Sequence, residues 1–250
     1  MIGARLAVIS LLAAAIACGV VAQTPSEPTV VITGANRGLG LEFARQFSAA
    51  GYQVIGTARR PEAADELRSL GVRIVKLDVV DSESVEQFAT ALGDGPVDIL
   101  INNAGIGGRA LSIDELDVDA VDRFFQVNCL GPMRVTQAVL PALRRGDRKL
   151  VVNITSMLGS IERNTRGGYY GYRESKAALN MFTRTLALEL QPEGFTCIVM
   201  NPGWVRTDLG GPHARLSPQE SIGAMITVIE SLTAQDTGSF FSHGGERVPW

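Results

Sequence analysis

The stretch TVVITGANRGLG, residues 29–40, decides the fold of this chain. Its first part, 30–32, is a β-branched run that predicts a buried strand. Three glycines follow: Gly34, Gly38 and Gly40. Glycine allows unusual backbone angles and lets a phosphate approach without a Cβ in the way. The apolar spacing up to Ala50 predicts a helix whose N-terminus points at that phosphate. The stretch therefore indicates a dinucleotide site, and an ordinary tight turn between strand and helix is the alternative.

The rest of the sequence alternates between strand and helix patterns. Further strands are expected at 53–58, 73–77, 96–101, 150–154, 195–200 and 238–241, and further helices at 62–70, 82–92, 116–143, 172–190 and 218–232. Such alternation predicts an α/β fold, because helices then cover both faces of a parallel sheet. We expect a Rossmann-type, doubly wound parallel sheet of about seven strands, in a single domain at 29–250.

Composition narrows the class of partner. The chain has 250 residues, 46% hydrophobic and 20% charged, so it can bury a full core. A net charge of -3 offers no basic stripe for nucleic acid, and small molecules are the favoured partners. Three scattered cysteines and two histidines form no metal-binding pattern, so no metal is expected. A Ser-His-Asp hydrolase would lack the Gly-x-Ser-x-Gly motif that supports such an assignment.

The N-terminal residues differ from the rest. A positive charge near the start, an uncharged run from Leu6 to Val21 and a polar, proline-broken end match a secretory signal peptide at 1–22 and a linker at 23–28. The run is also long enough for a membrane anchor, Cys18 lies in a loose lipobox, and a buried helix is a further alternative. Two localisations stay open: the periplasm or envelope of a bacterium, or the cytoplasm if the leader is not used.

The end of strand 53–58 favours NADP over NAD. An acidic residue about 20 positions past the glycines would bind a free ribose 2′-hydroxyl, whereas arginine suits a 2′-phosphate. This chain has Arg59 and Arg60 there, and Arg37 in the glycine loop can reach the same phosphate. Exposed, solvated arginines are the alternative interpretation.

Two further strand ends carry residues suited to a nucleotide. After 73–77, Asp78 can accept a hydrogen bond from an adenine amino group while Val79 covers the ring. Asp78 is almost equally well explained as a residue leading into the next helix. The following strand ends in NNAG, 102–105, whose small residues let a cofactor pass close.

Ser156 lies just past strand 150–154. The carboxyl ends of parallel strands meet at one edge of the sheet, so this serine is expected beside the glycine loop and the NNAG motif. Its hydroxyl can bind a substrate carbonyl. Thr155 and Ser160 are rival hydroxyls, and a plain turn serine is the alternative to a functional one.

Tyr172 and Lys176 stand four residues apart on a predicted helix. This spacing places a phenol and an amine on one helix face, where the ammonium charge favours the phenolate and Tyr172 can exchange a proton. Tyr169 and Tyr170 are competitors, but neither has a lysine four positions later. A surface tyrosine beside an unrelated lysine is the alternative for this pair taken alone.

Asn128 is a polar residue in the middle of the predicted helix 116–143, and Pro132 follows one turn later. An asparagine inside a helix needs a hydrogen-bond partner. It can hold a water for a proton relay, or it can satisfy the backbone near the proline, and the residues alone do not decide between these roles.

The bend after strand 195–200 completes the expected cofactor site. Pro202 and Gly203 fix a turn that can lay backbone, including that of Val205, against a nicotinamide amide, and Thr207 is a donor. The glycine-rich segment 208–216 reads as a lid over the substrate.

Together these motifs resemble the short-chain dehydrogenase/reductase family from residue 29 onward. The matching positions are TGxxxGxG at 33–40, NNAG at 102–105, Asn128, Ser156, Tyr172-x3-Lys176 and Pro202-Gly203. The stretches YRESKAALN at 172–180 and PGWVRTD at 202–208, with the ending VPW, are similar to the branch of C-factor and sniffer-type carbonyl reductases. Two features depart from the family: Ser156 precedes Tyr172 by sixteen residues, and a leader comes before the first strand.

The resemblance implies an NADPH-dependent enzyme that reduces a ketone or aldehyde, or runs in reverse. Its catalytic residues would be Asn128, Ser156, Tyr172 and Lys176. The residues expected to bind NADP(H) are Gly34, Asn36, Arg37, Gly38, Leu39, Gly40, Arg59, Asp78, Val79, Asn103, Ala104, Gly105, Tyr172, Lys176, Pro202, Gly203, Val205 and Thr207. A homo-oligomer is compatible with family habit. The second expectation is an envelope-associated signalling protein that keeps the fold as a nucleotide-binding module.

Overall fold

The computed structural model describes residues 27–108 and 111–250. In this part of the chain a seven-stranded sheet has the order β3-β2-β1-β4-β5-β6-β7, with every pair parallel. The strands are β1 Thr29–Ile32, β2 Gln53–Ala58, β3 Arg73–Lys76, β4 Ile99–Asn102, β5 Leu150–Ile154, β6 Thr196–Asn201 and β7 Phe240–Ser242. The predicted doubly wound parallel sheet is confirmed.

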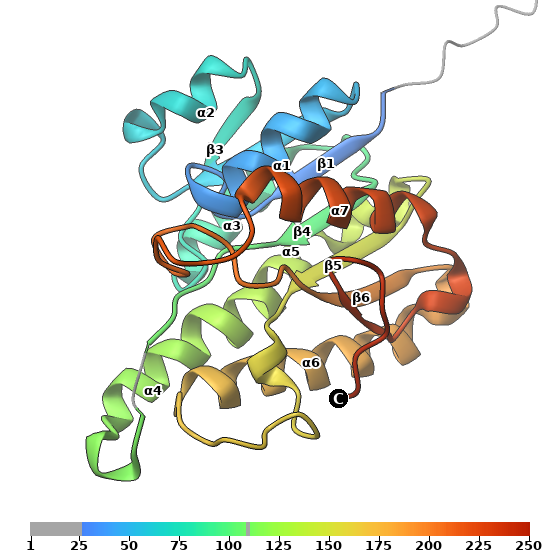
Figure 1. Ribbon diagram of the computed structural model, residues 1–250. Coiled ribbons are helices and arrows are strands. Elements are labelled where there is room, and N and C mark those ends of the chain that lie inside the picture. The colour runs from blue at the N-terminus through green and yellow to red at the C-terminus, as the bar shows by residue number, and fades with distance from the viewer. Residues whose placement is uncertain (1–26, 109–110) are drawn as a thin grey trace, which may run out of the picture.

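Helices cover both faces of this sheet (Figure 1). They are α1 Gly38–Ala49, α2 Asp65–Ser69, α3 Ser82–Leu92, α4 Val118–Phe125, α5 Gly131–Arg145, α6 Tyr172–Leu190 and α7 Pro218–Ser231. Short 3-10 turns lie at Pro61–Ala63, Ile113–Glu115, Met157–Gly159, Gln191–Glu193 and Ala234–Asp236.

The core has two layers because side chains alternate along each strand. In β1, Val30 and Ile32 face one layer, which they share with α1 and α7, while Val31 faces the other layer, beneath α3, α5 and α6. All three are fully buried. Burial on both sides explains why the central strands read as continuous apolar runs rather than as alternating ones.

The helix predicted at 116–143 is interrupted. A π-helical turn, Gln126–Leu130, separates α4 from α5, and Asn128 lies in its middle. Pro132 lacks an N–H, so it cannot donate to the carbonyl of Asn128 four residues earlier, and the regular helix cannot continue unchanged through this point. Periodic apolar spacing extends across the interruption, which is why the sequence predicted one helix.

The predicted leader and linker, 1–22 and 23–28, lie outside the described residues, apart from the last positions of the linker. Across 27–108 and 111–250, no helix is both long enough and apolar enough to cross a bilayer. The same residues contain no group of three or more histidine, cysteine or acidic side chains arranged to hold a metal ion.

Candidate active site

The glycine loop after β1 has the geometry of an anion-binding turn. Gly34 and Gly38 have positive φ angles of 64° and 55°. A Cβ at Gly40 would lie 2.2 Å from the carbonyl oxygen of Gly34, so only glycine fits there. The first turn of α1 has no acidic residue, and no side chain caps it at Arg37. Its N–H groups thus point from an uncapped, electropositive helix end, which fits the phosphates of a dinucleotide.

Thr33 ties this loop to the NNAG motif. Its hydroxyl accepts hydrogen bonds from the backbone N–H groups of Asn103, at 2.9 Å, and Ala104, at 3.0 Å. In return, the Asn103 amide donates to the carbonyls of Thr33, at 2.9 Å, and Gly34, at 3.2 Å. The ends of β1 and β4 are therefore locked together. This role of Thr33 was not predicted from the sequence, although the residue immediately precedes the glycines.

The residues predicted at the adenosine end lie along the same edge of the sheet. Arg59, which follows β2, is exposed, and Arg37 is exposed with its guanidinium 2.8 Å from the carboxylate of Asp208. Val79 is buried against the position of Gly131 in α5. Asp78 accepts a hydrogen bond from the N–H of Val80 at 3.2 Å. Asp208, as the partner of Arg37, was not anticipated from the sequence.

Tyr172 is the first residue of α6, and Lys176 lies one turn further along the helix. The Lys176 side chain is buried, and its Nζ donates to the carbonyl of Ile154 at 2.8 Å, at the end of β5. The same Nζ lies 6.0 Å from the centre of the Tyr172 ring. The lysine thus connects the helix that carries the phenol to the strand that leads to Ser156.

Burial dominates the electrostatics of this pair. It lowers the pKa of Lys176 to about 8, because the charged ammonium is desolvated. Burial also raises the pKa of Tyr172, against a smaller lowering by a hydrogen bond with Ser156. From the sequence, we expected the ammonium of Lys176 to lower the pKa of the phenol. In the structure the effect that opposes burial comes from Ser156.

Ser156 begins the turn that follows β5. Its hydroxyl accepts a hydrogen bond from the N–H of Leu158 at 3.1 Å and caps the short helix Met157–Gly159. The residue is only partly buried, so its hydroxyl adjoins both Tyr172 and solvent-accessible space. Of the rival hydroxyls, Ser160 donates to the carbonyl of Pro249 at 2.7 Å and is buried away from solvent.

Asn128 is fully buried and bridges two segments of the site. Its Oδ1 accepts from the N–H of Ile106 at 2.9 Å, and its Nδ2 donates to the Ile106 carbonyl at 3.0 Å and the Ser175 hydroxyl at 3.1 Å. A Cβ placed on Gly105 would lie 3.3 Å from the Asn128 Oδ1 and 3.6 Å from the Lys176 Nζ. The NNAG motif, the π-turn and α6 therefore converge at this point.

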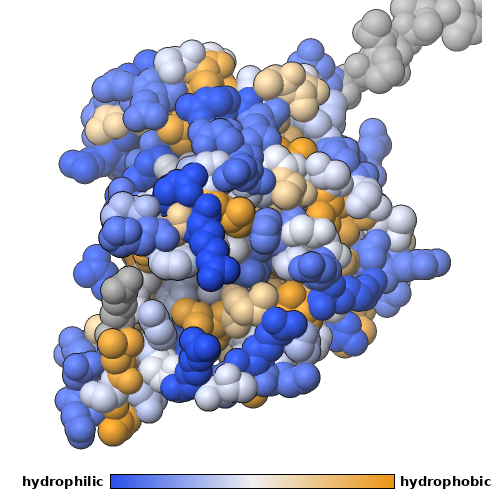
Figure 2. Space-filling model, in the orientation of Figure 1, coloured by the Kyte–Doolittle hydropathy of each residue, from blue (hydrophilic) through white to orange (hydrophobic). Residues whose placement is uncertain are grey.

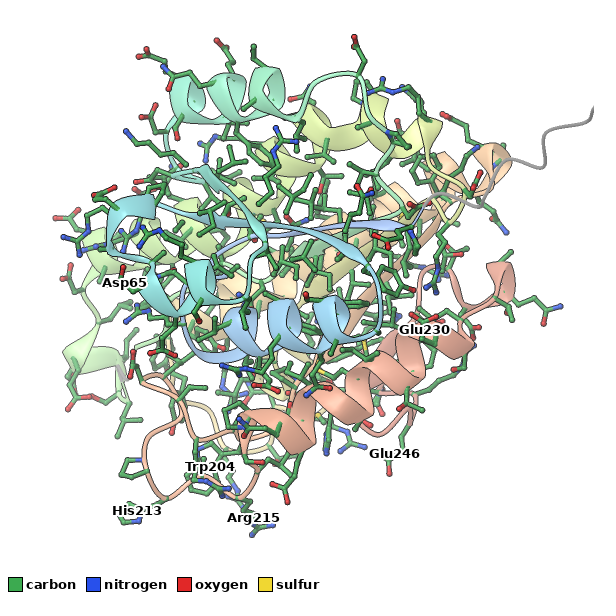
Figure 3. All side chains as sticks on the ribbon, turned by 90° about the horizontal axis from the view of Figure 1, so that it is seen from above. Asp65, Trp204, His213, Arg215, Glu230 and Glu246 are labelled. Atoms are coloured by element: carbon green, nitrogen blue, oxygen red, sulfur yellow. The ribbon has the colours of Figure 1, made fainter. Side chains whose placement is uncertain are left out.

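The bend after β6 is held by contacts within its own segment. Gly203 has a φ of 81°, and Val205, which is buried, forms an isolated bridge with Leu216. Thr207 accepts from the N–H of Gly210 at 3.2 Å. Trp204, at the start of this loop, is labelled in Figure 3 with His213 and Arg215, and the loop forms one edge of the molecule. The segment predicted as a lid is thus an internally hydrogen-bonded loop.

This loop lies against the glycine loop and the segment after NNAG. A Cβ on Gly38 would lie 3.6 Å from a carbon of Thr207. The side chain of Leu209 occupies the space where a Cβ on Gly107 would stand, 2.2 Å away. Thr207 therefore stands beside the glycine loop, where the sequence predicts a phosphate site.

A cavity of about 390 Å³ is lined by residues including Leu116, Val121, Phe124 and Tyr170. The Phe124 ring packs edge-on against Tyr172 with centroids 6.4 Å apart, which joins the cavity wall to the phenol. Apolar side chains also gather at the surface around α4 in Figure 2, where Leu111, Ile113 and Val118 are exposed. From the sequence, Tyr170 was only a competitor of Tyr172.

Comparison with known proteins gives the family of the chain. The family described as short chain dehydrogenase matches residues 28–215. C-signal of Myxococcus xanthus is 48% identical over 163 residues, which cover 65% of this chain and 98% of that protein.

Two solved structures share the fold. The carbonyl reductase Sniffer of D. melanogaster has a TM-score of 0.85 and 30% identity, covering 90% of this chain and 100% of that one. The NADPH-bound carbonyl reductase from chicken fatty liver has a TM-score of 0.84 and 33% identity, covering 90% of this chain and 99% of that one.

Proposed function

The chain belongs to the short-chain dehydrogenase family of oxidoreductases, in the branch of C-factor and Sniffer-type carbonyl reductases, and on that premise we propose that it is an NADPH-dependent carbonyl reductase. The substrate class is a ketone or aldehyde, and the same site can oxidise the alcohol in reverse. One observation carries the proposal: a partly buried phenol, Tyr172, meets Ser156 and a buried Lys176 beside an uncapped, glycine-lined helix end.

The residues fit a dinucleotide along the carboxyl edge of the sheet. Gly34, Gly38 and Gly40 leave room for the diphosphate at the N-terminus of α1. Asp78 and Val79 would hold the adenine, and the Pro202 to Thr207 bend would hold the nicotinamide amide. When bound, the reduced nicotinamide supplies the hydride.

NADP is the proposed form of the cofactor. Arg37 and Arg59 follow the neighbouring parallel strands β1 and β2, so both guanidiniums are available to a 2′-phosphate. The ion pair of Arg37 with Asp208 is exposed on both sides and is worth about 0–1 kcal/mol, which a phosphate can replace. The chicken carbonyl reductase, a solved structure of similar fold, contains NADPH.

Side chains of the protein would carry out the proton transfer. Ser156 would donate a hydrogen bond to the carbonyl oxygen and hold it against Tyr172, which transfers its proton as that oxygen gains negative charge. Lys176 fixes α6 to β5 and places a cationic group below the phenol. The Asn128 carbonyl, to which Pro132 cannot donate, is the proposed anchor for the water that returns the proton to Tyr172.

The test is steady-state oxidation of NADPH by the purified chain with a panel of aldehydes and ketones. Tyr172→Phe keeps the ring and removes the proton donor, so kcat should fall by at least about 10²-fold. Tyr169→Phe makes the same change three residues earlier, on a ring that lies 5.9 Å from the Arg173 guanidinium, and should keep near-normal turnover. Full activity in Tyr172→Phe would defeat the mechanism.

A second function is favoured by the 48% identity to C-signal. In that reading the protein is an envelope-associated signalling protein, and the fold only binds a nucleotide. Quenching or enhancement of NADPH fluorescence measures binding separately from turnover. Binding without turnover on any carbonyl, unchanged in Tyr172→Phe, would favour the binding module over the reductase.

The N-terminal residues have a proposed role in export. Residues 1–22 would act as a signal peptide or anchor, 23–28 as a linker, and 29–250 as the catalytic domain. N-terminal mass analysis of the native protein after cell fractionation distinguishes cleavage near Ala22, lipidation at Cys18 and an intact Met1. Intact Met1 in a soluble fraction would defeat the export proposal.

A further inference from the structure

We propose that Asn180 is a positioning residue that fixes Ser156 opposite Tyr172. The inference rests on the proposed reductase function and assigns a role to a side chain that touches neither substrate nor cofactor. Asn180 lies on α6, two turns after Tyr172, and its side chain is only 3% exposed.

The Asn180 amide bonds to both sides of the Ser156 turn. Its Oδ1 accepts from the hydroxyl of Thr155 at 2.7 Å, and its Nδ2 donates to the carbonyl of Gly159 at 3.0 Å. Both contacts are buried. One side chain thus forms hydrogen bonds with Thr155, the residue before Ser156, and with Gly159, the last residue of the short helix that Ser156 caps.

Three successive turns of α6 set the relation between the phenol and the serine. Tyr172, Lys176 and Asn180 are spaced by four residues, so they lie along one face of the helix. Lys176 holds the carbonyl of Ile154, and Asn180 holds Thr155 and Gly159. The helix that carries the proton donor therefore also holds the chain immediately before and after Ser156.

The Ser156 turn sits directly on this helix face. A Cβ on Gly159 would lie 2.9 Å from the Cβ of Lys176 and 3.2 Å from the Asn180 amide nitrogen. On the opposite side, the Ser160 hydroxyl donates to the Pro249 carbonyl at 2.7 Å. Because the turn keeps this second attachment, loss of the Asn180 amide should displace Ser156 without unfolding the segment.

A small displacement of Ser156 should lower kcat without changing the affinity for the cofactor. Misplacing a reacting group by about 1 Å can cost as much as 10²-fold in rate. Cofactor binding should not change, because the two hydrogen bonds of the Asn180 amide go to Thr155 and Gly159, outside the glycine loop and the NNAG motif. The hydrogen bond from Ser156 lowers the pKa of Tyr172, so loosening it should move the basic limb of the kcat profile to higher pH.

The experiment compares Asn180→Leu with a matched control on the same helix. Leucine has a similar volume and forms neither bond. Thr183→Val removes two other buried bonds, which the Thr183 hydroxyl accepts from Asn153 at 2.7 Å and donates to the Leu179 carbonyl at 2.8 Å, without touching the Ser156 turn. Each variant is assayed for kcat, KM, the NADPH dissociation constant, the pH profile and the thermal midpoint.

Asn180→Leu should lower kcat by about 10-fold or more and leave the NADPH dissociation constant within about twofold. Thr183→Val should retain kcat at a comparable thermal midpoint. The decisive measurement is a double-mutant cycle: in a Ser156→Ala background, Asn180→Leu should cause no further loss of kcat, since its effect passes through Ser156.

Losses that multiply in the Ser156→Ala background, or a kcat no lower than in Thr183→Val, would overturn the inference while leaving the reductase function intact. If the parent chain itself reduces no carbonyl, the proposed function fails, and the inference fails with it. Should Asn180→Leu not fold, Thr155→Val removes only the hydroxyl that donates to Asn180. That variant should show the same kcat loss, smaller in size, and a kcat equal to the parent's would again overturn the proposal.

Discussion

Replacing Thr33 by valine tests whether one hydroxyl joins the glycine loop to the NNAG motif. Valine has nearly the same shape as threonine, and the Thr33 side chain is 1% exposed, so the packing changes little. What is lost is the oxygen that accepts from the N–H groups of Asn103 and Ala104. The perturbation therefore isolates two hydrogen bonds at the point where β1 and β4 end.

The magnitude follows from the two lost hydrogen bonds, which are not equivalent. The Asn103 N–H keeps a second partner, the Ile101 carbonyl at 3.0 Å, so its lost bond costs about 0.5–1.5 kcal/mol. The Ala104 N–H is left without this partner, which costs about 1–3 kcal/mol. The methyl group that replaces the hydroxyl recovers about 1 kcal/mol by its own burial. Thr33→Val should thus lower the free energy of unfolding by about 2 kcal/mol. Thr33→Ser keeps the hydroxyl and should lose only about 1 kcal/mol, for one methyl group.

The assay is urea unfolding of the parent and both variants, followed by far-UV circular dichroism and tryptophan fluorescence. Coincident transitions justify the comparison of free energies in a chain of this size. NADPH affinity should weaken in the same order, since the Asn103 amide also holds the Gly34 carbonyl. A valine variant no less stable than the serine variant would refute the argument that these bonds hold the loop.

Lys176→Met should remove a pH dependence of stability. Burial lowers the pKa of Lys176 in the native state to about 8 from 10.5, so the unfolded state binds more protons between these two values. The parent should therefore gain stability over the variant as pH rises from about 8 to 10.5. Urea midpoints measured at intervals across that range check the sign, and a constant difference would contradict it. Gly40→Ala should abolish NADPH binding, because the new Cβ would meet the Gly34 carbonyl oxygen. The control is Gly223→Ala, within α7, where a Cβ makes only ordinary contacts. This variant should bind NADPH normally and gain roughly 0.5–1 kcal/mol in the free energy of unfolding measured in urea. Arg37→Met should weaken NADPH by about 10-fold and NADH far less; equal effects on both dissociation constants, measured by fluorescence titration, would remove this arginine from the 2′-phosphate site.

Local patterns account for what the sequence could predict. The glycine loop, the NNAG motif and the apolar runs are short, and each follows from the backbone or burial needs of a few neighbouring residues. A parallel sheet then brings the strand ends to one edge, whatever the details of the helices. This is why Gly34, Gly40, Ser156 and Tyr172 could be placed on the same side of the molecule without a structure.

The remaining features depend on contacts between distant segments. Asn128 was left between a relay role and a backbone role, and its partners, Ile106 and Ser175, belong to a loop and a helix that its own sequence neighbourhood does not reveal. Asn180 is 25 residues from Thr155, with which it bonds. Helical spacing also cannot distinguish a continuous helix from one with a π-turn, because the apolar face is nearly the same in both.

The direction of the Tyr172 pKa shift matters for the proposed chemistry. A phenol whose pKa is raised by burial holds its proton at neutral pH, so the resting site is already loaded with the acid that carbonyl reduction requires. When the phenol has passed its proton to the substrate oxygen, the ammonium of Lys176, itself desolvated, would stabilise the phenolate that remains. Oxidation of an alcohol needs the opposite starting state, a deprotonated Tyr172, so the reverse reaction should have its optimum at higher pH than reduction. Measured profiles with coincident optima for the two directions would show that another group transfers the proton.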